Sequence, residues 1–157
     1  MKKASLEQFI NRYNLGGEVE SVKITSSDSE MKVSFISDDK TLLGEVTSKE
    51  GEFPNGEFGV YTTSQLKALL GVLESSMDVD STESYIKFSD KGTSVNYMLA
   101  DLSVIPVVPD LKAVPPMNVQ ITLDDDFTSK FIKSKGALSE SDTFTFECKG
   151  GKGEIIL

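Results

Sequence analysis

The pattern of apolar residues predicts two short helices near the start of the chain. The first has four apolar residues at the spacing of one helix face: Leu6, Phe9, Ile10 and Tyr13. Ser5 is placed to cap this helix, and Gly16 is placed to end it. The second helix covers residues 64–75, and its buried stripe consists of Leu66, Leu69, Leu70 and Leu73.

Between and after these helices, apolar and polar residues alternate with the period of a β-strand. The alternation predicts strands at residues 19–25, 31–37, 42–48, 58–62, 84–88 and 94–99. Short runs of Ser, Asp, Gly and Lys separate them, as expected of antiparallel hairpins. Asp78, Asp80 and Glu83 are interpreted as an acidic loop. The first part of the chain is therefore predicted to be an α+β domain with mainly antiparallel sheets.

A proline-rich segment follows. Four of the five prolines lie within IPVVPDLKAVPPMN, residues 105–118. Proline fixes φ and favours extended backbone before it, so this segment is predicted to connect two domains. The boundaries are a first domain at 1–105, a connector at 106–118 and a second domain at 119–157. The connector is unusually apolar for a linker, through Val107, Val108, Leu111 and Val114.

The helix and strand pattern starts again after the connector. A strand is predicted at 119–123, followed by a helix whose first turn contains Asp124, Asp125 and Asp126. Acidic residues at this position match the helix dipole, which explains them better than a metal site does. Phe127, Phe131 and Ile132 form the apolar side of the helix, and Gly136 is expected to end it. Strands at 143–148 and 154–157 complete the pattern.

Shifting the sequence by 122 positions places the second pattern on the first without a gap. Phe9 and Ile10 then align with Phe131 and Ile132, and Leu157 aligns with Phe35. Few residues are identical, so this is interpreted as a structural repeat, with a chance match of two helix-and-hairpin patterns as the alternative. If the repeat is real, the second domain is incomplete, and roughly 70 residues of it would be missing.

Composition excludes several classes of protein. The chain has 157 residues, a net charge of −9, no histidine and one cysteine, Cys148. The absence of histidine removes the usual Ser and Cys catalytic arrangements and most zinc sites. A single cysteine cannot form an intrachain disulfide, and no apolar run is long enough for a membrane span. The sequence therefore predicts a soluble, cytoplasmic protein with no metal and no cofactor.

In order, spacing and character, most of the chain resembles the DNA-polymerase sliding clamp of T-even-type bacteriophages. The resembling segments are 1–46, 59–61, 65–73, 86–108 and 123–157, including DKGTSVNY at 90–97 and IPVVP at 105–109. The resemblance implies the sliding-clamp fold, with two short helices per domain lining an inner face and antiparallel sheets outside. It also implies a ring, a homotrimer in the phage family, that encircles double-stranded DNA and tethers the polymerase without catalysis.

Two sets of candidate binding residues follow. Cations on or beside the three helices would contact phosphates without reading sequence: Lys2, Lys3, Arg12, Lys67, Lys130, Lys133 and Lys135. For any one of them, a simple solvated lysine or arginine is the alternative. The apolar connector residues Val107, Val108, Leu111 and Val114 would bind peptides of the polymerase and the clamp loader, unless the connector packs on its own sheet.

Two other classes of function stay open. A β-rich phage structural or assembly protein would share the acidic balance and the repeat, but it would not need a basic helix face. An enzyme without histidine would need two carboxylates that converge in a cleft, and the sequence does not place two acids in this way.

Overall fold

The computed structural model describes residues 1–49, 53–110, 116–117, 119–138, 140 and 143–156. The chain divides into two compact units, Met1–Asp110 and Leu111–Leu157, here called unit 1 and unit 2. Among the described helices, none combines the length and the apolar character needed to cross a membrane.

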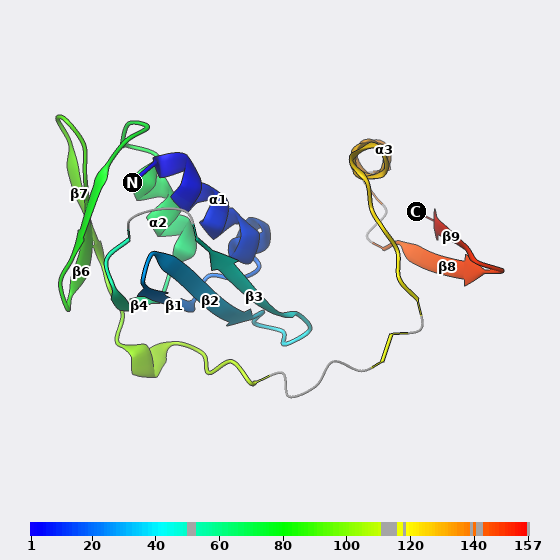
Figure 1. Ribbon diagram of the computed structural model, residues 1–157, viewed down its shortest axis with the longest axis horizontal. Helices are drawn as coiled ribbons and strands as arrows, with labels where there is room; N and C mark the ends of the chain where they lie inside the picture. The colour runs from blue at the N-terminus through cyan, green and yellow to red at the C-terminus, as the bar shows by residue number, and fades with distance from the viewer. Residues whose placement is uncertain (50–52, 111–115, 118, 139, 141–142, 157) are drawn as a thin grey trace. The chain divides into compact units, whose positions relative to one another are not determined.

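Unit 1 contains two antiparallel sheets and two helices (Figure 1). The helices are α1, Lys3–Asn14, and α2, Thr63–Leu70. The four-stranded sheet has the order β3 (Leu43–Ser48), β2 (Glu30–Ile36), β1 (Val22–Ser27), β4 (Gly56–Val60). The three-stranded sheet has the order β5 (Asp78–Ser81), β6 (Tyr85–Ser89), β7 (Ser94–Met98).

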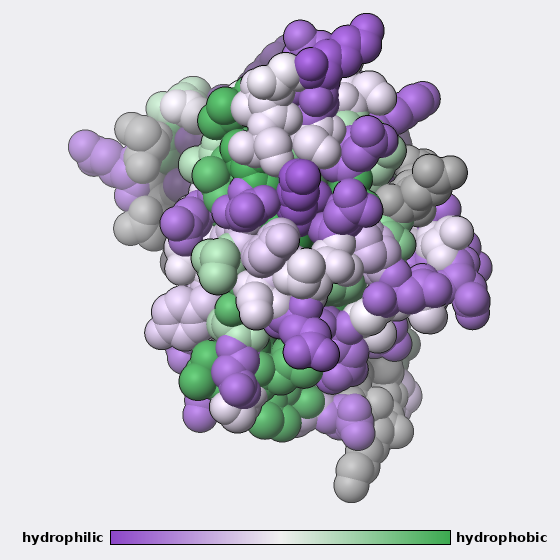
Figure 2. All heavy atoms as spheres, turned by 90° about the vertical axis from the view of Figure 1, so that its left-hand side faces the viewer, coloured by the Kyte–Doolittle hydropathy of each residue, from purple (hydrophilic) through white to green (hydrophobic). Residues whose placement is uncertain are grey.

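The core of unit 1 forms where the helices pack against the apolar faces of the strands. Leu6, Phe9 and Ile10 of α1 are buried, at the spacing that the sequence predicted. Val22 and Ile24 of β1 belong to the same cluster, and Lys23 between them is exposed. One face of the four-stranded sheet is therefore covered by helices, and the other is polar. The side of the molecule that carries β6 and β7 is mixed, with hydrophobic patches among hydrophilic side chains (Figure 2).

Some predicted boundaries in unit 1 are wrong. The acidic stretch that begins at Asp78 is strand β5, which pairs with β6, because exposed acids alternate with the half-buried Val79 and Ser81. Helix α2 ends at Leu70, five residues earlier than predicted. Helix α1 begins at Lys3, and Lys2 precedes it without a side-chain cap, so Ser5 is not the N-cap.

Unit 2 contains α3, Asp125–Ala137, and a hairpin of β8, Thr145–Lys149, and β9, Lys152–Ile156. Asp124 caps α3 by accepting a hydrogen bond from the Phe127 amide at 2.7 Å. The strand predicted at 119–123 is wrong, because these residues have no regular secondary structure. Gly136 does not end α3, and Ile132, which was assigned to the apolar side of the helix, is 64% exposed.

The two units share one helix-and-hairpin arrangement, with equivalent residues separated by 122 positions. The pair Ser27 and Glu30 closes the β1–β2 hairpin, and Lys149 and Lys152 close the β8–β9 hairpin at equivalent positions. Each hairpin turn contains two residues with positive φ, Asp28 and Ser29 in the first and Gly150 and Gly151 in the second. Positive φ at both central residues fits the right-handed twist of the strands.

The α+β class is thus confirmed, with antiparallel sheets and a few helices. Helix α3 and both strands of the hairpin fall within one or two residues of the positions that the shift of α1, β1 and β2 gives. The internal repeat is therefore present in the backbone as well as in the pattern of residues, although few side chains are identical.

Candidate partner-binding groove and helix surfaces

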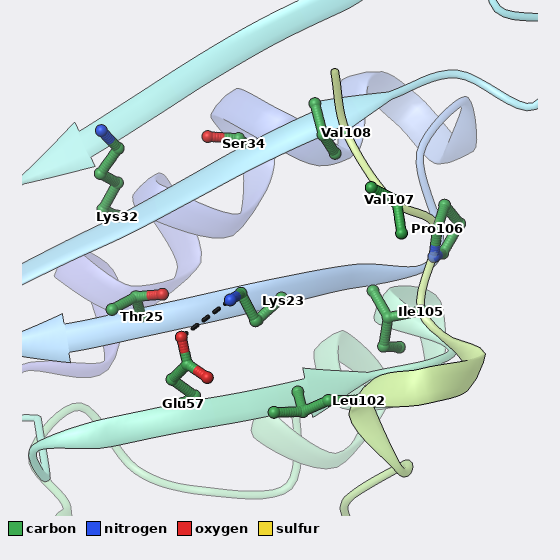
Figure 3. A pocket seen from close by; sticks show the side chains of 10 residues that line it. All are labelled: Lys23, Thr25, Lys32, Ser34, Glu57, Leu102, Ile105, Pro106, Val107 and Val108. Carbon is green, nitrogen blue, oxygen red and sulfur yellow. Dashed lines mark hydrogen bonds and ion pairs between the residues drawn. The ribbon is translucent and has the colours of Figure 1, made fainter. Parts of the chain in front are cut away.

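A groove of about 540 Å³ lies on the polar face of the four-stranded sheet, beside the start of the predicted connector (Figure 3). Its two sides differ in chemistry. Strand side chains supply the polar side: Lys23, Thr25, Lys32, Ser34 and Glu57. The segment after β7 supplies the apolar side: Leu102, Ile105, Pro106, Val107 and Val108. A partner that fills this groove needs both apolar and charged groups.

The path of the chain after β7 creates this apolar side. The Ala100 amide donates to the Gly59 carbonyl at 2.9 Å, which attaches the segment to β4. Asp101 then caps the 3₁₀ helix Leu102–Val104 by accepting from the Ser103 amide at 2.8 Å. Ile105 is 7% exposed and anchors the segment. Ile105 has extended backbone, as expected of the residue before a proline, here Pro106.

The predicted peptide-binding residues fall into two groups. Val107 and Val108 line the groove, as Figure 3 shows, with Val108 half-buried and Val107 92% exposed. Leu111 and Val114 lie outside the described residues. The sequence analysis did not include the polar side of the groove. The alternation within the strands is the signal that could have marked Lys23, Thr25, Lys32 and Ser34 as outward-facing, but only the tertiary fold shows that they lie beside the connector.

An ion pair lies within the groove. The Lys23 ammonium is 2.8 Å from Glu57 Oε1 across the β1–β4 pair, shown as a dashed line in Figure 3. A second pair, Lys32 and Glu45, has an N–O distance of 2.9 Å on neighbouring strands. Both pairs are about half exposed, so solvent screens them and they add little to stability. Each remains accessible for exchange with a charged group of a partner.

On α1, the candidate cations differ in surroundings. Arg12 is exposed and lines a shallow hollow with Gln8 and Asn11 on the solvent face of the helix. Lys2 is exposed just before the helix. Lys3, in contrast, donates to the Leu73 carbonyl at 2.9 Å and lies 3.7 Å from Glu7, so it connects α1 to the segment after α2.

The cations of α2 and α3 also differ. Lys67 is half-buried and donates to Asn14 Oδ1 at 3.4 Å. Lys130 pairs with Asp126 one turn earlier at 2.7 Å. Lys133 is exposed on the surface of α3, and Lys135 is half-buried. Arg12 and Lys133 are therefore exposed on their helices, whereas Lys3, Lys67 and Lys130 make contacts within the chain.

Glu20 organises the start of α2 next to the groove segment. Its carboxylate accepts from the Ser64 amide at 2.8 Å, from the Ser64 hydroxyl and from Asn14 Nδ2. Partial burial by itself would raise the pKa of Glu20, but these hydrogen bonds and the nearby Lys67 ammonium lower it overall. This carboxylate acts as a cap that fixes the orientation of α2 on the core.

Among the described residues, no three acidic or cysteine side chains come together in a way that could hold a metal ion. Asp124, the first residue of the acidic run, is the N-cap of α3. Cys148 is exposed on β8. The candidate functional surfaces are therefore the groove and the exposed helix cations.

Comparison with known protein families found no match. Comparison with curated proteins also found none. Among solved structures, the chain is similar to the DNA polymerase III subunit beta from Pseudomonas aeruginosa, with a TM-score of 0.47 and 12% sequence identity. The similarity covers 70% of this chain and 32% of that chain, so the present chain spans about a third of that protein. At this TM-score and identity, the similarity assigns neither a family nor a function.

Proposed function

We propose that this chain is a subunit of a DNA sliding clamp, a non-catalytic ring that encircles double-stranded DNA and tethers a replicative polymerase. The observation that carries the proposal is the repeated helix-and-hairpin unit with an exposed helix cation in each copy. Shifted by 122 positions, Arg12 of α1 falls beside Lys133 of α3, and both are exposed. Repeated helices that present cations suit a surface that contacts phosphates without reading bases.

The charge balance of the protein supports the same function. The net charge is −9, and Arg12 is its only arginine. Arginine is the side chain that most often reads guanine, so its scarcity fits contact without sequence preference. Weak phosphate contacts let a protein slide, while a closed ring would prevent it from dissociating. An acidic exterior would then limit binding to DNA outside the ring.

The groove supplies the second part of the proposal. We assign it the binding of peptides from the polymerase and the clamp loader, with Val107, Val108, Leu111 and Val114 as the apolar contacts. The location would be the cytoplasm, and the phage-type homotrimer is the expected assembly. The domain boundaries at 105 and 118 belong to the same proposal.

Retention on closed DNA tests the topological part of this proposal. The protein is loaded onto nicked circular DNA and onto linear DNA of equal length, and each complex is gel-filtered in high salt. A clamp stays on the circle and slides off the linear ends. Cleavage of the circle should release it. Equal retention on both forms, or none on either, would reject the clamp and favour the structural-protein alternative.

A further inference from the structure

Unit 2 contains a cluster of four phenylalanines that its described residues leave half-buried, at Phe127 and Phe131, or exposed, at Phe144 and Phe146. The rings of Phe127 and Phe131 stack with their centroids 6.3 Å apart. The rings of Phe131 and Phe144 meet edge-to-face, with a centroid distance of 5.2 Å. Phe146 completes the cluster through an edge-to-face contact with Phe144, with a centroid distance of 5.4 Å. These four residues are called the phenylalanine face. Phe146 lies on β8 and Phe144 directly precedes it, and the two side chains are 46% and 49% exposed.

The equivalent positions of unit 1 are buried. Phe144 and Phe146 correspond to Val22 and Ile24, each 1% exposed. Phe131 corresponds to Phe9, which is also 1% exposed. The same helix-and-hairpin arrangement therefore has a closed core in unit 1 and an open one in unit 2. The difference arises from what else packs on the arrangement, since the backbone register of the two hairpins is the same.

In unit 1, one continuous segment supplies much of this cover. Strand β4 pairs antiparallel with β1, which places Val60 opposite Val22 and Phe58 opposite Ile24. Helix α2 follows β4 and packs against α1, with Leu66 and Leu70 buried. Within the described part of unit 2, β8 pairs with β9 alone, so the edge equivalent to the β1–β4 edge has no strand.

We propose that the phenylalanine face and the outer edge of β8 form an assembly surface for a strand-and-helix segment with the chemistry of β4 and α2. The occupant adds a strand antiparallel to β8, with large apolar side chains at alternate positions, and then a helix with leucines four residues apart. Main-chain hydrogen bonds would set the direction of the strand, and the leucines would cover the rings. This inference does not depend on binding to DNA.

A graft built from the chain itself tests this. Residues 36–99 are repeated directly after Leu157, which continues the 122-residue shift without a gap. Two measurements are made on the parent and the grafted chain: emission of the apolar dye ANS, and amide hydrogen exchange across β8. Covering the face should lower ANS emission at least about threefold and slow the β8 exchange about tenfold or more. The matched control carries aspartate at Phe58 and Leu66 of the appended copy.

The proposal is overturned if the active graft and the aspartate control give the same ANS emission and the same exchange. A parent chain that dimerises with rising concentration and loses its ANS emission would overturn it in favour of a second copy as occupant. A variant of the parent chain provides a test that does not require the graft to fold. F144D/F146D should remove most ANS emission while leaving exchange in unit 1 unchanged, and undiminished emission would also overturn the proposal.

Discussion

The Ala100 amide donates a hydrogen bond to the Gly59 carbonyl at 2.9 Å. The backbones of the two residues are so close here that Gly59 has no room for a side chain. A Cβ on Gly59 would clash with the Ala100 carbonyl oxygen and would lie 3.5 Å from Ile105 Cγ1. This contact joins β4 to the segment after β7, and the same segment carries the apolar side of the groove.

Gly59→Ala is therefore expected to destabilise unit 1. The neighbouring atom is backbone and cannot move as a flexible side chain does, so the loss should be about 2–3 kcal/mol, within the range of overpacked sites. Urea unfolding followed by circular dichroism measures it. Gly92→Ala is the matched control, because a Cβ at Gly92 meets no atom within 4 Å. Equal stability of the two variants would contradict the close approach.

Glu20→Gln is expected to produce a pH-dependent loss of stability. The folded state lowers the pKa of Glu20 below its ordinary value of 4.5. The carboxylate therefore stabilises the fold above pH 4.5, and this contribution disappears as the pH falls through the lowered pKa. At pH 7 the loss should stay below about 1 kcal/mol, because the group is largely solvated. Thermal melting of both proteins between pH 7 and pH 3 measures the difference.

The control for this experiment is Glu18→Gln, which changes the same charge at an exposed position nearby. Its melting temperature should stay close to that of the parent, because the side chain of Glu18 is exposed. If the Glu20→Gln difference is the same at pH 7 and pH 3, the carboxylate does not cap α2 in the way described.

Charge reversal on the helices should weaken binding to duplex DNA. Arg12→Glu and Lys133→Glu are each expected to lower affinity about three- to tenfold at low salt, and the loss should shrink as salt rises. Lys130→Glu should have a smaller effect, because Lys130 already pairs with Asp126. Fluorescence anisotropy with a labelled duplex measures these affinities. Lys91→Glu, on the exposed β6–β7 turn, is the control, and an equal loss there would reject a helix-specific face.

Val108→Asp should weaken binding of polymerase or clamp-loader peptides to the groove. The substitution puts a charge at a half-buried apolar position, so the Kd is expected to rise about tenfold or more. Isothermal titration with synthetic peptides of the cognate polymerase and clamp loader measures it. Val72→Asp provides the same chemical change at a position that is 61% exposed after α2. Equal effects of the two substitutions, or none, would place the peptide site elsewhere.

The phenylalanine face shows where the sequence and the structure give different information. The pattern at Phe127, Phe131 and Ile132 predicted the apolar side of a helix, and α3 is present. Burial did not follow for Ile132, which is 64% exposed. Periodicity identifies which side chains share a face, but burial depends on a second surface, and unit 2 lacks a described counterpart of α2 and β4.

The difference between local pattern and tertiary contacts also explains which residues of the groove the sequence predicted. Local pattern predicted the extended apolar segment at Val107 and Val108, because proline restricts the backbone wherever it occurs. It did not predict Lys23, Thr25 and Glu57 as the opposite side of the groove. Those residues come from strands far apart in the chain, and only the pairing of β1 with β4 brings them together.

By itself, the sequence determined the α+β class, the helix faces and the 122-residue repeat, since these depend on spacing and on the conformational limits of single residues. The tertiary structure decided which apolar faces are covered, which lysines are used in internal contacts, and where the connector runs. Such features depend on contacts between distant segments. Strand β5 is an example: its exposed acids resemble a loop in sequence, and pairing with β6 makes it a strand.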